Sequence, residues 1–208
     1  MQSSIFLCLS QARINWEGCG SVPHHALLAL IRSLVVSSVD YCNSVLAGVS
    51  GHLLDRLQSV LNAAARLIFS ARKSEHITPL LSELHWLRVP ERIQLGLCVL
   101  EYRCLHDTAP PYLAEMLHPT TDVDGRCCLR SAATPTLLVP STCQSSLGDR
   151  AFPVAASRAW SCLPADVRDA PSLLTFRRRL KMLLFQSSYD WAWRLCSLYF
   201  CTSATFPR

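Results

Sequence analysis

The chain of 208 residues lacks any long uninterrupted apolar run, although half of its residues are hydrophobic. Charged residues or histidines interrupt each apolar stretch well before the roughly 20 residues that a membrane-spanning helix requires. The opening residues, MQSSIFLCLSQAR, have no basic segment and too short an apolar core for a signal peptide. These absences predict a cytoplasmic or nuclear protein that is not secreted and has no membrane partner.

Charged residues are scarce, at 17% of the chain, and mean hydropathy is positive. Such a composition indicates either a surface normally covered by a partner or a fragment of a larger protein whose former interfaces are exposed, and the fragment is the preferred interpretation. The net charge of +5 is uneven. Basic and acidic residues number nine each up to His118, but eleven and six beyond it, so any basic surface is expected in the C-terminal part.

The cysteines follow no pairing pattern. Eleven thiols, an odd number, in a chain without a signal peptide are expected to stay reduced. Cys8, Cys19, His24 and His25 supply four atoms of the kind that bind zinc, but no CxxC pair is present, and adjacent histidines rarely bind one tetrahedral ion. No metal site and no cofactor are predicted.

No hydrolase motif such as GxSxG is present. Ser82, Glu83 and His85 are neighbours in sequence, but neighbours on a helix point in different directions, so no catalytic residue is predicted. Trp86 and Trp160 are predicted to be core aromatics whose indole N–H groups bind carbonyl oxygens.

Hydrophobic periodicity predicts an all-α fold, an irregular helical array in two subregions with at most one short strand. The predicted divisions are a poorly defined N-terminal end (1–21), a helical subregion (22–118), a linker (119–147), a second helical subregion (148–186) and a hydrophobic tail (187–208). Helices are expected over 26–39, 52–70, from 78, from 90 to before 109, and over 112–117, 153–161 and 172–185. Residues 136–140 are the candidate strand.

Three local features carry structural predictions. Residues 27, 28, 30, 31, 34 and 35 predict a broad buried stripe on the first helix, and Thr78 before Pro79 predicts a side-chain cap. In 52–70, apolar residues recur at three- and four-residue steps, and Ala63 to Ala65 allow a close helix neighbour. Asp40, Tyr41 and Asn43 are expected to bridge helices through buried hydrogen bonds.

The last predicted helix carries Arg177, Arg178, Arg179 and Lys181 beside an apolar stripe. Four cations within about one and a half turns can follow a phosphate backbone, and Arg72 with Lys73 is a weaker candidate of the same kind. No aromatic residues alternate with these cations, so the expected contact is independent of base sequence. A solvated helix face would carry the same charges.

Short motifs occur in a particular order along residues 26–185. They are Asp40-Tyr41-Cys42-Asn43-Ser44, Leu61-Asn62-Ala63-Ala64-Ala65-Arg66-Leu67, His76-Ile77-Thr78-Pro79 with Leu84-His85-Trp86-Leu87, Ala109-Pro110-Pro111-Tyr112-Leu113, and Gly148-Asp149-Arg150-Ala151-Phe152 with Ala159-Trp160, Leu163-Pro164 and Phe176-Arg177. The ordered set resembles the C-terminal region of reverse transcriptases from jockey-like non-LTR (LINE-type) retrotransposons.

The resemblance implies helices beyond the polymerase palm, thumb-like or connecting, that hold RNA or DNA during target-primed reverse transcription. Polymerases of this family place paired aspartates on a palm hairpin to bind two divalent cations. No Asp-Asp pair occurs in the chain, and Asp122 and Asp124 lie in a polar stretch without a strand pattern. The chain is therefore predicted not to be an enzyme on its own. The alternatives are a helical module that binds itself or another protein through exposed apolar helix faces, and a non-functional relic of a decayed element.

Overall fold

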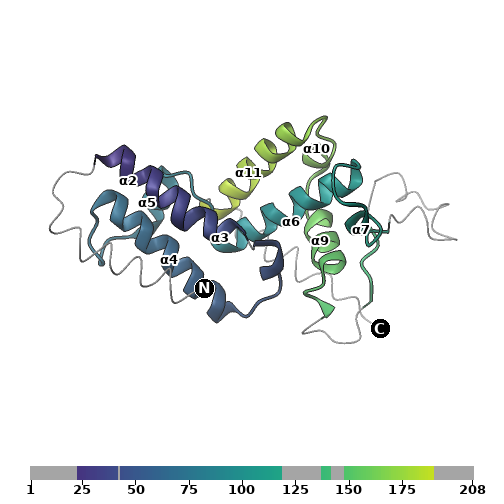
Figure 1. The fold of residues 1–208 in the computed structure, drawn as a ribbon, viewed down its shortest axis with the longest axis horizontal. Helices are drawn as coiled ribbons and strands as arrows, with labels where there is room; N and C mark the ends of the chain where they lie inside the picture. Colours follow the sequence, from purple (N-terminus) through teal and green to yellow (C-terminus); the bar gives the residue numbers. More distant parts are fainter. Residues whose placement is uncertain (1–22, 42, 119–136, 142–147, 190–208) are drawn as a thin grey trace. The chain divides into compact units, whose positions relative to one another are not determined.

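The computed structural model describes residues 23–41, 43–118, 137–141 and 148–189 (Figure 1). These residues form an all-α structure, as predicted, and contain no β-sheet. They divide into two compact units, which are described separately: residues 23–41, 50–89 and 187–189 belong to the first, and residues 43–49, 90–118, 137–141 and 148–186 to the second. The predicted end 1–21, most of the linker and most of the tail lie outside the described residues, as do Cys8, Cys19, Asp122 and Asp124.

The first unit opens with helix α2 (His24–Ile31), a π-helical turn η1 (Arg32–Val36) and helix α3 (Ser37–Tyr41), which follow one another without a break. Figure 1 shows this run lying alongside α4 (Gly51–Phe69), and both α2 and η1 contact α4. The buried side chains of the run are Leu27, Ile31, Val35 and Val39. The predicted stripe is therefore partly wrong, because Leu30 and Leu34 are more than half exposed.

The buried side chains of this run recur every four residues. In an ideal α-helix each four-residue step drifts by about 40° around the axis, because successive residues are about 100° apart. The wider π turn reduces that drift, so Leu27 and Val39 both reach the core. Ser33, Ser37 and Ser38 donate their hydroxyl hydrogens to backbone carbonyls of the preceding turn, a pattern that competes with regular helical bonding.

Helix α4 confirms the predicted amphipathic segment. Val60, Leu61, Ala64, Ala65 and Ile68 are buried, and the charged residues lie on the other side. The helix ends where Ser70 adopts a left-handed conformation (φ 51°), and the Ala71 amide donates to the Arg66 carbonyl at 2.9 Å. This 6→1 bond satisfies a terminal carbonyl of the helix.

Helix α5 (Ile77–Glu83) begins one residue earlier than predicted. His76, not Thr78, occupies the N-cap position, and it makes no side-chain capping bond. The predicted Thr78 cap is therefore wrong; its hydroxyl accepts a long 3.5 Å bond from Arg88 instead. Leu84, Trp86, Leu87 and Val89 follow and are buried.

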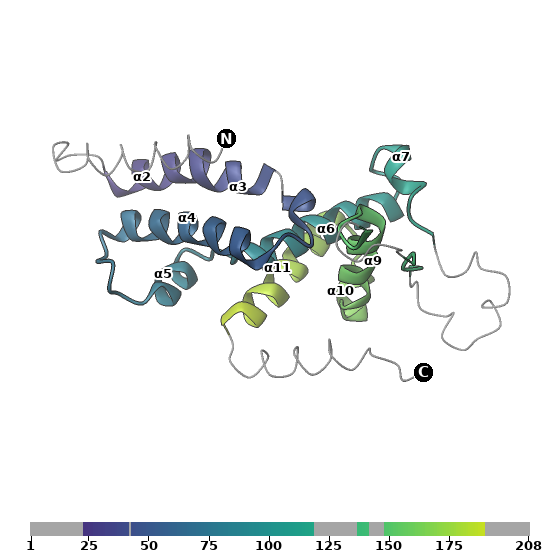
Figure 2. The same ribbon diagram turned by 90° about the horizontal axis from the view of Figure 1, so that it is seen from below.

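The second unit contains the 3-10 turn η2 (Asn43–Leu46), α6 (Val89–Leu105), α7 (Pro111–Ala114), α9 (Phe152–Ser161), α10 (Ala165–Arg168) and α11 (Leu173–Tyr189), except for the terminal residues of α6 and α11 that belong to the first unit. Figure 2 shows the ribbons of helices α6, α9 and α11. These helices supply most of the core of the unit, in which Phe176, Leu180, Val154 and Cys98 are nearly inaccessible. The predicted helices from 90, over 153–161 and over 172–185 are confirmed to within a few residues.

The candidate strand over 136–140 is not formed in the part of the chain that the structure describes. Leu137 is buried, and the Leu138 amide donates a 2.8 Å hydrogen bond to the His118 carbonyl. One such bond fastens the segment to the end of the preceding turn but makes no sheet.

Candidate functional site

The residues just before helix α11 determine where the helix begins. Pro171 precedes it, and the Ser172 side-chain oxygen accepts a hydrogen bond from the Thr175 backbone amide at 3.3 Å. Serine at this position satisfies an amide that has no partner inside the helix. The hydroxyls of Ser172 and Thr175 are also 2.9 Å apart and share a hydrogen bond. The first turn of α11 is therefore held in place just where its basic segment begins.

One side of α11 is anchored in the core of the second unit. Phe176, Leu180 and Leu184 are buried at four-residue steps. The Phe176 ring stacks on Tyr102 of α6 with centroids 4.4 Å apart, and it also contacts the Trp160 ring of α9 at 5.7 Å. Burial of one stripe fixes which residues must point away from the core.

The predicted cations all lie on the solvent side of α11, but they are not equivalent. Arg177, Arg178 and Lys181 are exposed and make no hydrogen bond or ion pair with another described residue. The Arg179 guanidinium instead donates a 2.6 Å hydrogen bond to the carbonyl oxygen of Asp166 in α10. Three of the four predicted cations are thus free to meet a ligand, and the fourth is committed to a neighbouring helix.

Two apolar side chains accompany these cations and were not singled out by the sequence. Leu174 is 80% exposed and Met182 is 57% exposed. They lie four residues before and after Arg178, so the three share one row of the helix surface. We call Leu174, Arg177, Arg178, Lys181 and Met182 the outer face of α11. A signal for the apolar pair was present, because both residues fall outside the core stripe of Phe176, Leu180 and Leu184.

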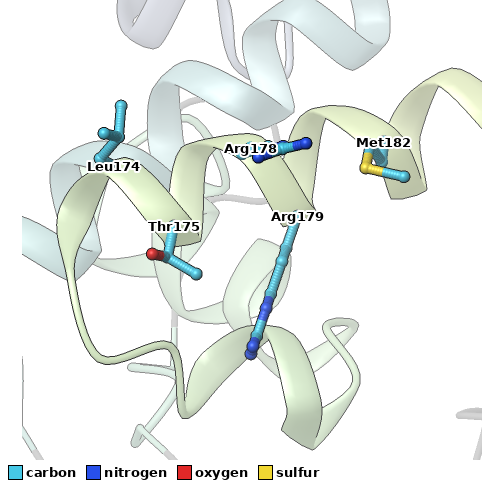
Figure 3. Close-up of a pocket in the computed structure, with 5 residues that line it drawn as sticks. All are labelled: Leu174, Thr175, Arg178, Arg179 and Met182. Atoms are coloured by element: carbon cyan, nitrogen blue, oxygen red, sulfur yellow. The ribbon is translucent and has the colours of Figure 1, made fainter.

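A shallow hollow of about 550 Å³ lies on this part of the helix. It is lined by Leu174, Thr175, Arg178, Arg179 and Met182, and Figure 3 shows Leu174, Arg178 and Met182 along the helix while Arg179 extends toward the neighbouring short helix. Its lining joins apolar side chains to cationic ones. Such a lining suits a ligand that carries both negative charge and apolar surface.

Comparison of the chain with protein-family models, curated proteins and solved structures found no match. The family resemblance therefore rests on the ordered sequence motifs alone.

The second basic candidate belongs to the first unit. Arg72 and Lys73 are exposed in the loop between α4 and α5. The Glu75 carboxylate accepts a 3.0 Å bond from the Arg72 backbone amide, and the Glu75 carbonyl accepts a 3.4 Å bond from Arg66. A carboxylate beside the two cations weakens the local attraction for phosphate.

A second hollow, of about 450 Å³, brings together segments that are distant in sequence. Ala47 and Gly48, the start of α6 and one side of α9 line it. At its edge Asp149 and Arg158 form a 2.9 Å ion pair, and Gly48 lies against the Arg150 side chain. Of the Gly148-Asp149-Arg150 motif, Asp149 lines the hollow and Arg150 lies against Gly48. The ion pair is partly exposed and contributes little to stability.

The second unit buries one carboxyl group. Glu101 of α6 is 0% exposed, and neither of its oxygens has a hydrogen-bond partner among the described residues. Burial raises its pKa to about 8. Burial also raises the pKa of the Cys98 thiol, with a smaller contribution from Glu101, and raises that of Cys104. A raised thiol pKa disfavours the thiolate, so these cysteines are not activated nucleophiles.

The proposed structural residues occupy different environments. Trp86 and Trp160 are buried, and Asn43 is buried in η2. Tyr41, by contrast, is 84% exposed and Asp40 is exposed at the end of α3, so the predicted buried bridge of Asp40, Tyr41 and Asn43 is wrong as a three-residue unit. The Trp160 indole N–H also lacks the expected carbonyl partner among the described residues.

A metal centre would need several His, Cys, Asp or Glu side chains close together in the described part of the chain. No group of three or more His, Cys, Asp or Glu residues there is arranged to hold a metal ion. No described helix is long and apolar enough to cross a membrane.

Proposed function

We propose that this chain is the C-terminal region of a jockey-like non-LTR retrotransposon reverse transcriptase, lacking the catalytic palm, and that it binds RNA or DNA without base specificity. The ordered motifs over residues 26–185 support the family. The absence of an Asp-Asp pair from the sequence supports a binding role without polymerisation.

The observation that carries the binding proposal is the group of unpaired cations on α11. Arg177, Arg178 and Lys181 have no anionic partner among the described residues, and the helix that carries them is anchored by Phe176. Cations that approach phosphates release condensed counterions, which favours binding and makes it dependent on salt.

The test is a salt series with labelled RNA and DNA. Each phosphate contact to a single strand contributes a slope of about −0.7 in log affinity against log salt. Replacing Arg177, Arg178 and Lys181 with alanine should therefore flatten the slope by about 2 and weaken binding at low salt. The control variant removes the same number of positive charges by replacing three other exposed arginines with alanine: Arg32, Arg56 and Arg103. Equal losses in the two triple variants would show only a general charge effect and contradict the proposal.

A helical protein-interaction module is the second candidate, and one observation favours it. Leu30, Leu34 and Tyr41 are all more than half exposed on the α2–α3 run. The serine hydroxyls nearby are bonded back to the helix, which reduces the polarity of that surface. Association through this surface should persist as salt rises, unlike phosphate binding, and Leu30→Ser with Leu34→Ser should abolish it in sedimentation experiments.

A further inference from the structure

Resting on the proposed nucleic-acid function, we infer that the outer face of α11 is built for unpaired, single-stranded nucleic acid and disfavours duplex. The inference comes from the combination of protruding apolar side chains with unpaired cations on one side of the helix and a charge-balanced surface beyond the other.

Exposed apolar side chains form a row along the outer face of α11. Leu174, Arg178 and Met182 follow one another at four-residue steps, which spans about 12 Å along the helix. A duplex keeps its bases stacked inside and presents phosphates and sugars, which would leave Leu174 and Met182 against hydrated groups. A single strand can turn its unstacked bases outward, and base faces can cover apolar side chains.

Charge is distributed unevenly on the two sides of this apolar row. With about 100° between successive residues, Arg177 and Lys181 fall on one side of the apolar row and Arg179 on the other. On the Arg179 side lies α10, to which Arg179 is bonded, and the charges of the exposed Asp166 and Asp169 are balanced there by Arg168 and Arg179. One backbone can therefore be attracted along the Arg177 and Lys181 side while its bases cover Leu174 and Met182.

A duplex cannot avoid the α10 side in the same way. A helix that enters the major groove of DNA meets a phosphate backbone on both sides, across a groove about 12 Å wide. One of the two backbones would then approach the α10 side, where Asp166 and Asp169 offset the cations Arg168 and Arg179 and leave no net attraction. The deep, narrow major groove of duplex RNA excludes the helix altogether.

The experiment uses the full chain and three labelled probes: oligouridine RNA, oligothymidine DNA and a mixed-sequence DNA duplex of the same length. Anisotropy titrations at low salt should give tighter binding of both single strands than of the duplex. Leu174→Gln with Met182→Gln, both on exposed side chains, should weaken single-strand binding roughly tenfold and leave duplex binding unchanged. Asp166→Asn with Asp169→Asn should strengthen duplex binding and leave single-strand binding unchanged.

Several outcomes distinguish this inference from the function on which it rests. Salt-dependent binding that is equal for strands and duplex, or that ignores the Leu174 and Met182 changes, overturns the inference and keeps the proposed function. Binding of none of the probes by a chain that melts cooperatively overturns both. A labelled acidic amphipathic peptide serves as a further probe: if it binds and the nucleic acids do not, the face belongs to a protein partner and the inference fails.

Discussion

The hydroxyl of Tyr102 donates a 2.8 Å hydrogen bond to the carbonyl oxygen of Ala170, 68 residues further along the chain. The same ring stacks on Phe176 and lies 4.1 Å, centroid to centroid, from the His106 ring. Tyr102 thus joins α6 to the turn before α11 and to the buried side of α11 itself. The orientation of the outer face depends on this residue, although Tyr102 does not belong to that face.

Replacement of Tyr102 with phenylalanine should lower the free energy of unfolding by about 1 to 2 kcal/mol, because the ring stays in place while the Ala170 carbonyl loses its donor. Urea denaturation measures the change. Tyr112→Phe, at an exposed tyrosine, is the control and should have little effect. A similar loss in both variants would contradict a specific role for the Tyr102 hydroxyl.

Glu101 should make the second unit less stable as pH rises. The carboxyl titrates near 4.5 when unfolded and near 8 when folded. Between these values the unfolded chain releases a proton that the folded chain retains, so the equilibrium shifts toward unfolding by about 1.4 kcal/mol per pH unit. Below this range the carboxyl is protonated in both states and its burial has no ionisation cost.

The Glu101→Gln variant has no ionisable group at this position, so comparing its unfolding free energy with that of the natural chain isolates the effect of the carboxyl. The difference in unfolding free energy between the variant and the natural chain should grow in favour of the variant from about pH 5 to about pH 8. Glu83→Gln, at an exposed glutamate, controls for the chemical change. A pH-independent difference for Glu101→Gln would show that the carboxyl is solvated in the folded protein.

Close packing at α4 predicts effects of very different size for adjacent alanines. Ala64 is completely buried and Ala63 is exposed. Ala64→Leu forces extra volume into a packed contact and should cost about 1 to 3 kcal/mol. Ala63→Leu should change stability by no more than about 0.5 kcal/mol. Thermal melts of the two variants, which differ only in position, give a direct comparison.

Gly48 is expected to resist substitution for two reasons. Its φ of +65° is unfavourable for other residues, and a Cβ added there would lie 2.7 Å from Cγ of Arg150. Gly48→Ala should cost about 1 kcal/mol or more. Gly51→Ala, where an added Cβ meets nothing within 4 Å, should be neutral or mildly stabilising. If Gly48→Ala with Arg150→Ala recovers part of the loss, that part is steric.

Periodicity was sufficient to predict the long helices. Most of the stripe of α4 lies in the core or at its edge, and of the face that periodicity predicts on α6, Ile93, Leu97 and Cys104 are buried while Leu100 is half-buried. It was insufficient where a turn departs from 3.6 residues. Leu30 and Leu34 are as apolar as their buried neighbours but are exposed, and Leu34 lies in the π turn, which no local signal marks.

The candidate site was predicted in composition but not in geometry. A run of three arginines and a lysine is visible in any listing of residues, and all four lie on the solvent side of α11. The bond from Arg179 to Asp166 depends on how α10 turns back against α11, which periodicity does not report. The burial of Glu101 was also hidden, because a charged residue in a helix is usually placed at the surface.

The π turn at Arg32–Val36 also constrains how this segment can change in length. A π turn contains about one residue more than the α-helical turn it replaces, so deleting a single residue there would restore regular helix. The lost residue and the lost wide turn compensate, so positions after the deletion keep their direction relative to α2. Val39 would stay in the core with Leu27 and Ile31, whereas a deletion within α2 itself would rotate every later position by roughly 100°. The segment should therefore tolerate the loss of Ser33 or Leu34 better than the loss of a residue from α2.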